Sequence, residues 1–183
     1  MMSMERVRRA GLGLALAGAW ILGGTAGAAA QNAEGMKTYL VDGFERAKAW
    51  DLEMAAAIPD SAMDWAPTPD VRNFAQQVIH TANNGFIAQA MFGEEAPPFG
   101  DEDTLVGDKA ALGMAVAKAY DYMIGKLQAM PASALGEQVD FFGRSMTRGR
   151  VALFALEHAM WTRGQLVPYL HAHGVAVPQA RLF

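Results

Sequence analysis

Residues 147–174 read TRGRVALFALEHAMWTRGQLVPYLHAHG, and this stretch decides the fold. Thr147 predicts the N-cap of a helix, because its hydroxyl can accept from a free backbone N–H of the first turn. Gly174 suits the left-handed position just past a helix end, and Pro178 prevents the helix from resuming. One face of this helix is apolar except for an imidazole and a hydroxyl; it comprises Val151, Phe154, Ala155, His158, Thr162, Leu166 and Tyr169. Pro168 lies four residues after Gly164 inside the pattern and predicts a local bend.

Three further stretches repeat apolar side chains at three- and four-residue spacing, and we expect helices over residues 35–57, 69–92 and 108–130. Thr68 with Pro69 predicts the start of the second helix, and Asp108 predicts the cap of the third. Long strand-like alternation is missing from the sequence, although residues 132–146 could include a short extended segment. Four amphipathic helices predict an all-α protein, a four-helix bundle.

The sequence also indicates which side chains face the core and which face water. In the proline-rich loop after the first helix, we expect Met63 and Trp65 to cover the end of the bundle as a hydrophobic plug. The charged residues of the first helix are expected to face mostly solvent; they are Glu45, Arg46, Lys48, Asp51 and Glu53.

The first thirty residues have the pattern of a cleavable signal peptide. Arg6, Arg8 and Arg9 form a positive start, and residues 11–23 are uncharged and mostly apolar. Small residues at positions 28–30 suit a signal peptidase, which predicts a mature domain of residues 31–183. The alternative is a retained membrane anchor, but the apolar run is shorter than the roughly 20 residues that a spanning helix needs. We therefore expect a bacterial periplasmic or secreted protein without stable membrane insertion.

Charge and cysteine content exclude several classes of function. The chain has a net charge of −4, which becomes −6 without the leader's three arginines and one glutamate. An acidic surface argues against nucleic acid as a partner, because binding to phosphates needs a basic patch. The chain has no cysteine, which excludes disulfides, a cysteine nucleophile and a thiolate metal site.

Two blocks of the sequence resemble a known family. Residues 58–93 read IPDSAMDWAPTPDVRNFAQQVIHTANNGFIAQAMFG, a proline-rich loop leading into a helix with one histidine. Residues 158–178 read HAMWTRGQLVPYLHAHGVAVP, a last helix that begins this block with a histidine and ends with glycine and proline. In order and separation these blocks resemble the DinB-like (YfiT-like) four-helix bundles, and the resemblance covers essentially all of the mature chain.

The resemblance implies a divalent metal site inside the bundle, with one histidine from the second helix and two from the last. Carried over to this sequence, the first two ligands fall on His80 and His158, and the third falls on Thr162, which departs from the pattern. A neutral threonine is a poor ligand for zinc or nickel, so the site implied here is incomplete. The resemblance also implies pairing into a homodimer.

Each of these residues has a structural alternative. His80 could be an ordinary exposed or half-buried residue, His158 could be a buried imidazole satisfied by a hydrogen bond, and Thr162 could bond the carbonyl of His158. His171 and His173 lie in the last helical turn, where positive character suits the helix dipole, and we assign no ligand role to either. Trp161 is expected to be a packing residue, while Gln165 could hydrogen-bond a bound molecule or the link before the helix.

Three functions are compatible with this pattern. One is a divalent-metal-dependent enzyme, a hydrolase or thiol S-transferase, which the family resemblance implies. Another is a metal-free bundle that binds a small apolar molecule or a partner in its pocket. The third is an envelope structural protein acting through dimerisation. The substitution at Thr162 favours the second, and the sequence leaves open whether the protein is an enzyme.

Overall fold

The computed structural model describes the backbone of residues 5–82, 85–94 and 105–180, and the side chains of residues 27–82, 87–94 and 105–180. Its helices are α1 Glu5–Ala57, α2 Phe74–Ala82, α3 Gly85–Phe92, α4 Lys109–Ala129, α5 Arg148–Gly164 and α6 Val167–Ala172. Two short 3₁₀ segments occupy Asp60–Ala62 and Ala132–Gly136, and strands β1 Gln138–Phe141 and β2 Arg144–Thr147 form one antiparallel hairpin.

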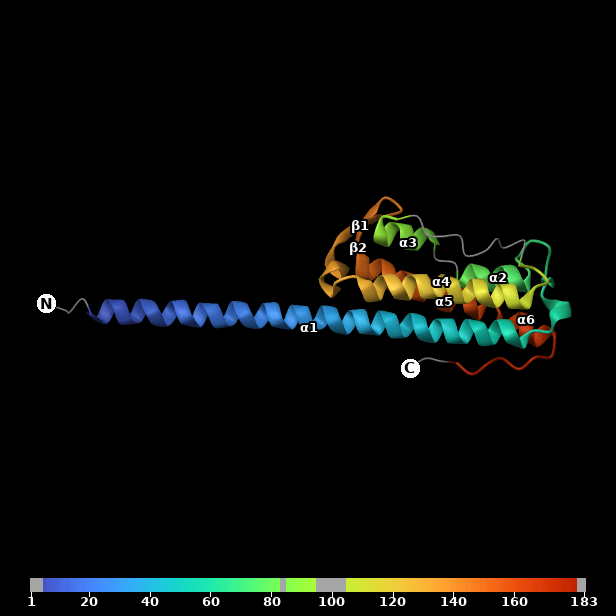
Figure 1. Ribbon diagram of the computed structural model, residues 1–183, viewed down its shortest axis with the longest axis horizontal. Helices are drawn as coiled ribbons and strands as arrows, with labels where there is room; N and C mark the ends of the chain where they lie inside the picture. The colour runs from blue at the N-terminus through green and yellow to red at the C-terminus, as the bar shows by residue number, and fades with distance from the viewer. Residues whose placement is uncertain (1–4, 83–84, 95–104, 181–183) are drawn as a thin grey trace.

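The helices form the expected bundle of four, in which the second is made of α2 and α3 and the fourth of α5 and α6. The C-terminal part of α1 lies along α4 and α5, and α2 packs against the same two helices (Figure 1). The hairpin lies beside α3 at one end of the bundle, and α6 lies at the other end (Figure 1). The fold therefore brings α2 and α5, which carry the two predicted histidines, into direct contact.

Helix α1 begins much earlier than the sequence pattern predicts. It runs without interruption from Glu5 to Ala57, whereas the apolar spacing indicates a start at Gly35. Residues 24–34 are rich in alanine and contain no proline, and each of the two glycines among them costs a helix only about 1 kcal/mol. The N-terminal part of α1 extends beyond the bundle (Figure 1). In the described part of the chain, no helix is both long and apolar enough to cross a bilayer.

The start of α2 differs from the prediction by several residues. Thr68 and Pro69 lie in a turn, and the helix begins at Phe74 after a capping box. The side-chain oxygen of Asn73 accepts from the Gln76 backbone N–H at 2.9 Å, and the Gln76 side chain accepts from the Asn73 N–H at 3.0 Å. This reciprocal pair satisfies two free donors at once, which a lone threonine cap cannot do.

Other predicted helix ends are confirmed. Asp108 accepts from the Ala111 backbone N–H at 2.8 Å, and α4 ends just before Pro131. Thr147 accepts from the Arg150 N–H at 3.3 Å at the start of α5. Gly174 follows α6 in the left-handed conformation, with φ of 67°.

The bend predicted around Pro168 is a full interruption of the helix. Helix α5 ends at Gly164, and α6 resumes at Val167 with the proline in its first turn. The proline has no N–H for the ladder, and its ring would press on the carbonyl four residues back, so the chain restarts the helix with proline at a tolerated position.

The short extended segment forms a tight hairpin. Phe141 pairs with Arg144, and the two residues between them, Phe142 and Gly143, have φ of 54° and 73°. Two successive residues with positive φ match the hairpin turn whose twist suits the flanking strands. The hairpin leaves Phe142 73% exposed at its tip.

The expected plug over the end of the bundle is confirmed. Met63 is 1% exposed, and Trp65 contacts both Tyr169 and His173 edge-on, with ring centroids 5.6 and 4.9 Å apart. Tyr169 is itself buried, and its hydroxyl donates to the Arg72 carbonyl at 2.6 Å. These contacts fix α6 and the loop before α2 against each other.

Candidate functional site

The structure brings together the two histidines that the sequence places far apart. His80 on α2 and His158 on α5 lie edge to face, with ring centroids 5.4 Å apart and an interplanar angle of 75°. Both side chains are half-buried. The pair therefore lies where α2 meets α5, open on one side to solvent.

The surroundings of His158 favour its neutral form. Burial lowers the pKa of His158 below its ordinary value of 6.5, and the charges of His80 and Arg72 lower it further. Its Nδ1 is buried and has no hydrogen-bond partner among the described residues. The unprotonated nitrogen of a neutral imidazole can accept a hydrogen bond, so a donor group of a bound molecule can pair with it beside the apolar rings.

Thr162 occupies the third position that the resemblance assigns to a ligand. Its hydroxyl donates to the His158 carbonyl at 2.7 Å and lies 3.2 Å from the Ala159 carbonyl, as expected for a helical threonine. The side chain is only 1% exposed. Its hydroxyl therefore faces the backbone of its own helix.

The residues present do not fit the three-donor metal site of the family. His80 and His158 supply two nitrogens, and Thr162 supplies a hydroxyl already used in a hydrogen bond. The described residues contain no group of three or more His, Cys, Asp or Glu side chains able to hold an ion. Zinc sites in proteins use at least three protein ligands, so we derive no reaction step through a metal here.

A row of aromatic rings runs along α5 to the histidine pair. Phe154 stacks on His158 with centroids 6.3 Å apart, and Phe141 packs against Phe154 at 5.1 Å. Trp161 continues the row, 6.5 Å from His158, and it is 69% exposed. Trp161 was expected to be a packing residue; it contacts the His158 ring, but the rest of its side chain is left uncovered by the elements that the structure describes.

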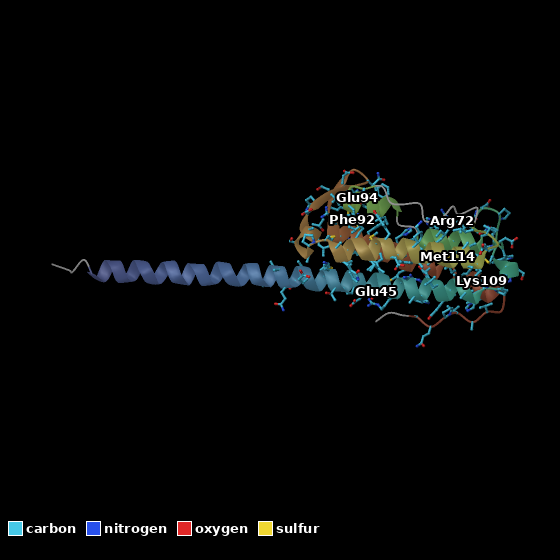
Figure 2. All side chains as sticks on the ribbon, in the orientation of Figure 1. Glu45, Arg72, Phe92, Glu94, Lys109 and Met114 are labelled. Atoms are coloured by element: carbon cyan, nitrogen blue, oxygen red, sulfur yellow. The ribbon has the colours of Figure 1, made fainter. Side chains whose placement is uncertain are left out.

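Where Gln77 on α2 meets Gln165 after α5, the surface becomes polar. The buried amide of Gln77 donates to the Thr162 carbonyl at 3.1 Å and to the Gln165 side-chain oxygen at 3.2 Å. A depression of about 620 Å³ opens there; its walls are Pro67, Asp70, Val71, Arg72, Gln77, Gln165, Pro168 and Tyr169. Arg72 lies beside the start of α2 (Figure 2). The surface between α2 and α5 thus changes from aromatic, at His158 and Trp161, to polar at this depression; we call this surface together with the depression the histidine groove.

A second polar cluster lies inside the bundle, and the sequence interpretation missed it. Asp51 is fully buried, whereas it was expected to face solvent like Glu45, which is exposed on α1 (Figure 2). The Arg163 Nε and the Tyr120 hydroxyl both donate to the Asp51 carboxylate, one oxygen each. Burial raises the pKa of Asp51, while Arg163 and Tyr120 act against that rise.

The spacing of α1 could have revealed this cluster. One series of buried positions in α1 follows alternating steps of four and three residues: Leu40, Phe44, Ala47, Asp51 and Met54. Asp51 falls within that series, so helical geometry places it on the core face. A buried carboxylate needs a paired cation, and Arg163 on α5 supplies it.

Comparisons with known proteins agree with this architecture. A family model described as the DinB superfamily matches residues 44–166. The structure resembles a DinB-like protein from Bacillus cereus with a TM-score of 0.61, at 16% identity over 78% of this chain and 95% of that one. It also resembles a DinB-like protein from Bacillus subtilis with a TM-score of 0.59, at 18% identity over 77% of this chain and 96% of that one. No curated protein matches the chain.

Proposed function

The chain belongs to the DinB superfamily, and from that premise we propose that it binds a small apolar molecule in the groove beside His80 and His158. The exposed end of the aromatic row carries the proposal. Trp161 leaves 69% of its surface in water although it lies next to His158 and one turn from Gln165. An exposed aromatic ring beside a polar depression leaves apolar area in water. A ligand that covers the ring buries this area, which contributes favourably to the free energy of binding.

The groove also indicates how such a ligand would lie. An apolar ring would rest on Trp161 and His158, since aromatic contacts are favourable at the centroid separations found in this row. A polar substituent would reach Gln77 and Gln165 one turn away. The neutral imidazole of His158 suits an apolar ligand, because a charged ring there would have to be desolvated.

A divalent-metal enzyme, a hydrolase or S-transferase, is the alternative. It would place zinc or nickel on His80 and His158 and would need a third donor from outside the described residues or from the ligand. The hydrogen bonds of Thr162 to its own helix are the observation against it. We therefore place the binding function first.

Indole provides a direct test of the proposal, because it is a small aromatic molecule without charge. We expect indole to shift the side-chain NMR resonances of His80 and His158, and Trp161→Ala to weaken that binding roughly tenfold by removing one stacking partner. Met114→Ala is the matched control, because Met114 is an exposed apolar residue on α4 with 68% exposure. Shifts spread over the surface, or binding that ignores Trp161→Ala, would refute the proposed site.

Export is a separate part of the proposal. The charged start and the small residues before position 31 support cleavage of a leader. Mass spectrometry of the protein isolated from a bacterial periplasm is expected to give Gln31 as the first residue. An intact N-terminus in the membrane fraction would instead support the retained anchor.

A further inference from the structure

A small cavity lies between α1 and α5, around the helix from the histidine groove. Its volume is about 90 Å³, enough for several water-sized groups. Gly43 lines it, and a Cβ at this glycine would come within 2.8 Å of a Leu156 methyl, so the two helices approach closely. Tyr39 and Met160 also line it and are 56% and 58% exposed. The cavity is thus an apolar-rimmed slot that reaches from solvent toward the bundle core.

The deep end of this slot carries hydrogen-bond donors. Arg163 is only 3% exposed, and its Nε and Nη2 are directed to Asp51, Tyr120 and the Ala47 carbonyl. Its Nη1 takes part in none of these bonds. The guanidinium carbon of Arg163 lies 4.8 Å from the centroid of the Trp50 ring. The indole Nε1 of Trp50 is buried and has no acceptor among the described residues.

The charge of the slot is positive. Arg46 and Arg163 are the two charged residues among those that line it. Asp51, beneath the slot, neutralises the charge of Arg163, so Arg46 gives the lining of the slot its positive charge. A buried N–H donor without an acceptor carries a desolvation cost that an anionic oxygen would remove. Donors at the deep end and apolar side chains at the rim together fit an amphipathic anion.

We propose that this slot binds the carboxylate of a small monocarboxylic acid. The carboxylate oxygens accept from Arg46, Arg163 and Trp50, and the short apolar chain of the acid lies against Tyr39 and Met160. The volume admits the carboxylate and the first carbons, while the rest of the chain stays at the exposed rim. This site is independent of the histidine groove, because Arg163 and Met160 face away from His158 on α5.

Butyrate and butyramide are the probes for this site, because they share a shape and differ in charge. In calorimetric titrations of the full chain at low salt, we expect butyrate to bind and butyramide to give no measurable heat. Arg46→Met should raise the Kd of butyrate roughly tenfold, the loss expected for one charged hydrogen bond. Arg46 is half-buried at the surface, so this variant keeps the fold. Butyrate should also shift the indole N–H resonance of Trp50, which Trp50→Phe identifies.

Two controls make the result specific. Arg144→Met removes an exposed arginine from the hairpin, and His158→Ala alters the other groove; neither should change the Kd of butyrate. Equal binding of butyrate and butyramide, no binding of either, or an unchanged Kd in Arg46→Met would each overturn the proposal. A loss of butyrate binding in His158→Ala would assign the acid to the histidine groove instead, which also overturns it.

Discussion

Arg163→Met is expected to lower the free energy of unfolding by about 3–5 kcal/mol, the usual cost of breaking a buried ion pair by removing one partner. Arg163 and Asp51 are 3% and 0% exposed, so the carboxylate left behind keeps the Tyr120 hydroxyl as its one hydrogen-bonding side chain among the residues that the structure describes. The stacking of the guanidinium on Trp50 is lost as well. Urea unfolding followed by circular dichroism at neutral pH measures the change.

An exposed ion pair provides the matched control for this variant. Arg150 and Glu157 lie 3.0 Å apart on the surface of α5, with half or more of each side chain exposed. Arg150→Met should cost at most about 1 kcal/mol, because water screens such pairs. A double variant, Asp51→Leu with Arg163→Met, should be more stable than Arg163→Met alone, since no buried charge remains. Equal costs for Arg163→Met and Arg150→Met would show that the buried pair does not hold α1 to α5.

Thr162→His is expected to increase zinc affinity by at least roughly 100-fold over the unaltered chain, because it supplies the third nitrogen donor. Position 162 follows His158 by one helical turn, so both side chains leave α5 on the same face, next to His80. Competition with a fluorescent chelator measures the zinc affinity of each protein. The buried site must enlarge to take the imidazole, so we also expect a lower melting temperature without metal.

Met160→His is the control for added histidine. Met160 lies two residues away but is exposed on the opposite face of α5, so its imidazole cannot converge with His80 and His158. It should leave zinc affinity near that of the unaltered chain. No gain in Thr162→His, or the same gain in both variants, would show that Thr162 does not stand at a ligand position.

Local patterns in the sequence predicted the helix ends that depend on a single residue. Thr147, Asp108 and Gly174 each satisfy or allow a helix terminus by themselves, so the sequence was sufficient. The predicted start of α2 was wrong because two residues, Thr68 and Asn73, can each cap a helix in this part of the sequence. The reciprocal bonds of Asn73 and Gln76 decide between them, and only the structure displays them.

The histidine pair was anticipated from the family resemblance rather than from helical periodicity. Spacing alone places His158 on the apolar face of its helix, but it does not say which helix faces it. The exposure of Trp161 could not be predicted for the same reason, because it depends on which side of α5 is left uncovered. Asp51 was misplaced because its charge was given more weight than its position in the buried series of α1.

The central claim is that the groove at His80 and His158 binds a small apolar molecule without a resident metal ion. The most direct test is the metal content of the protein purified without chelator, measured by mass spectrometry against protein concentration. The account predicts much less than one equivalent of zinc or nickel per chain, unchanged in the double variant His80→Ala, His158→Ala. One equivalent per chain that disappears in that double variant would contradict it.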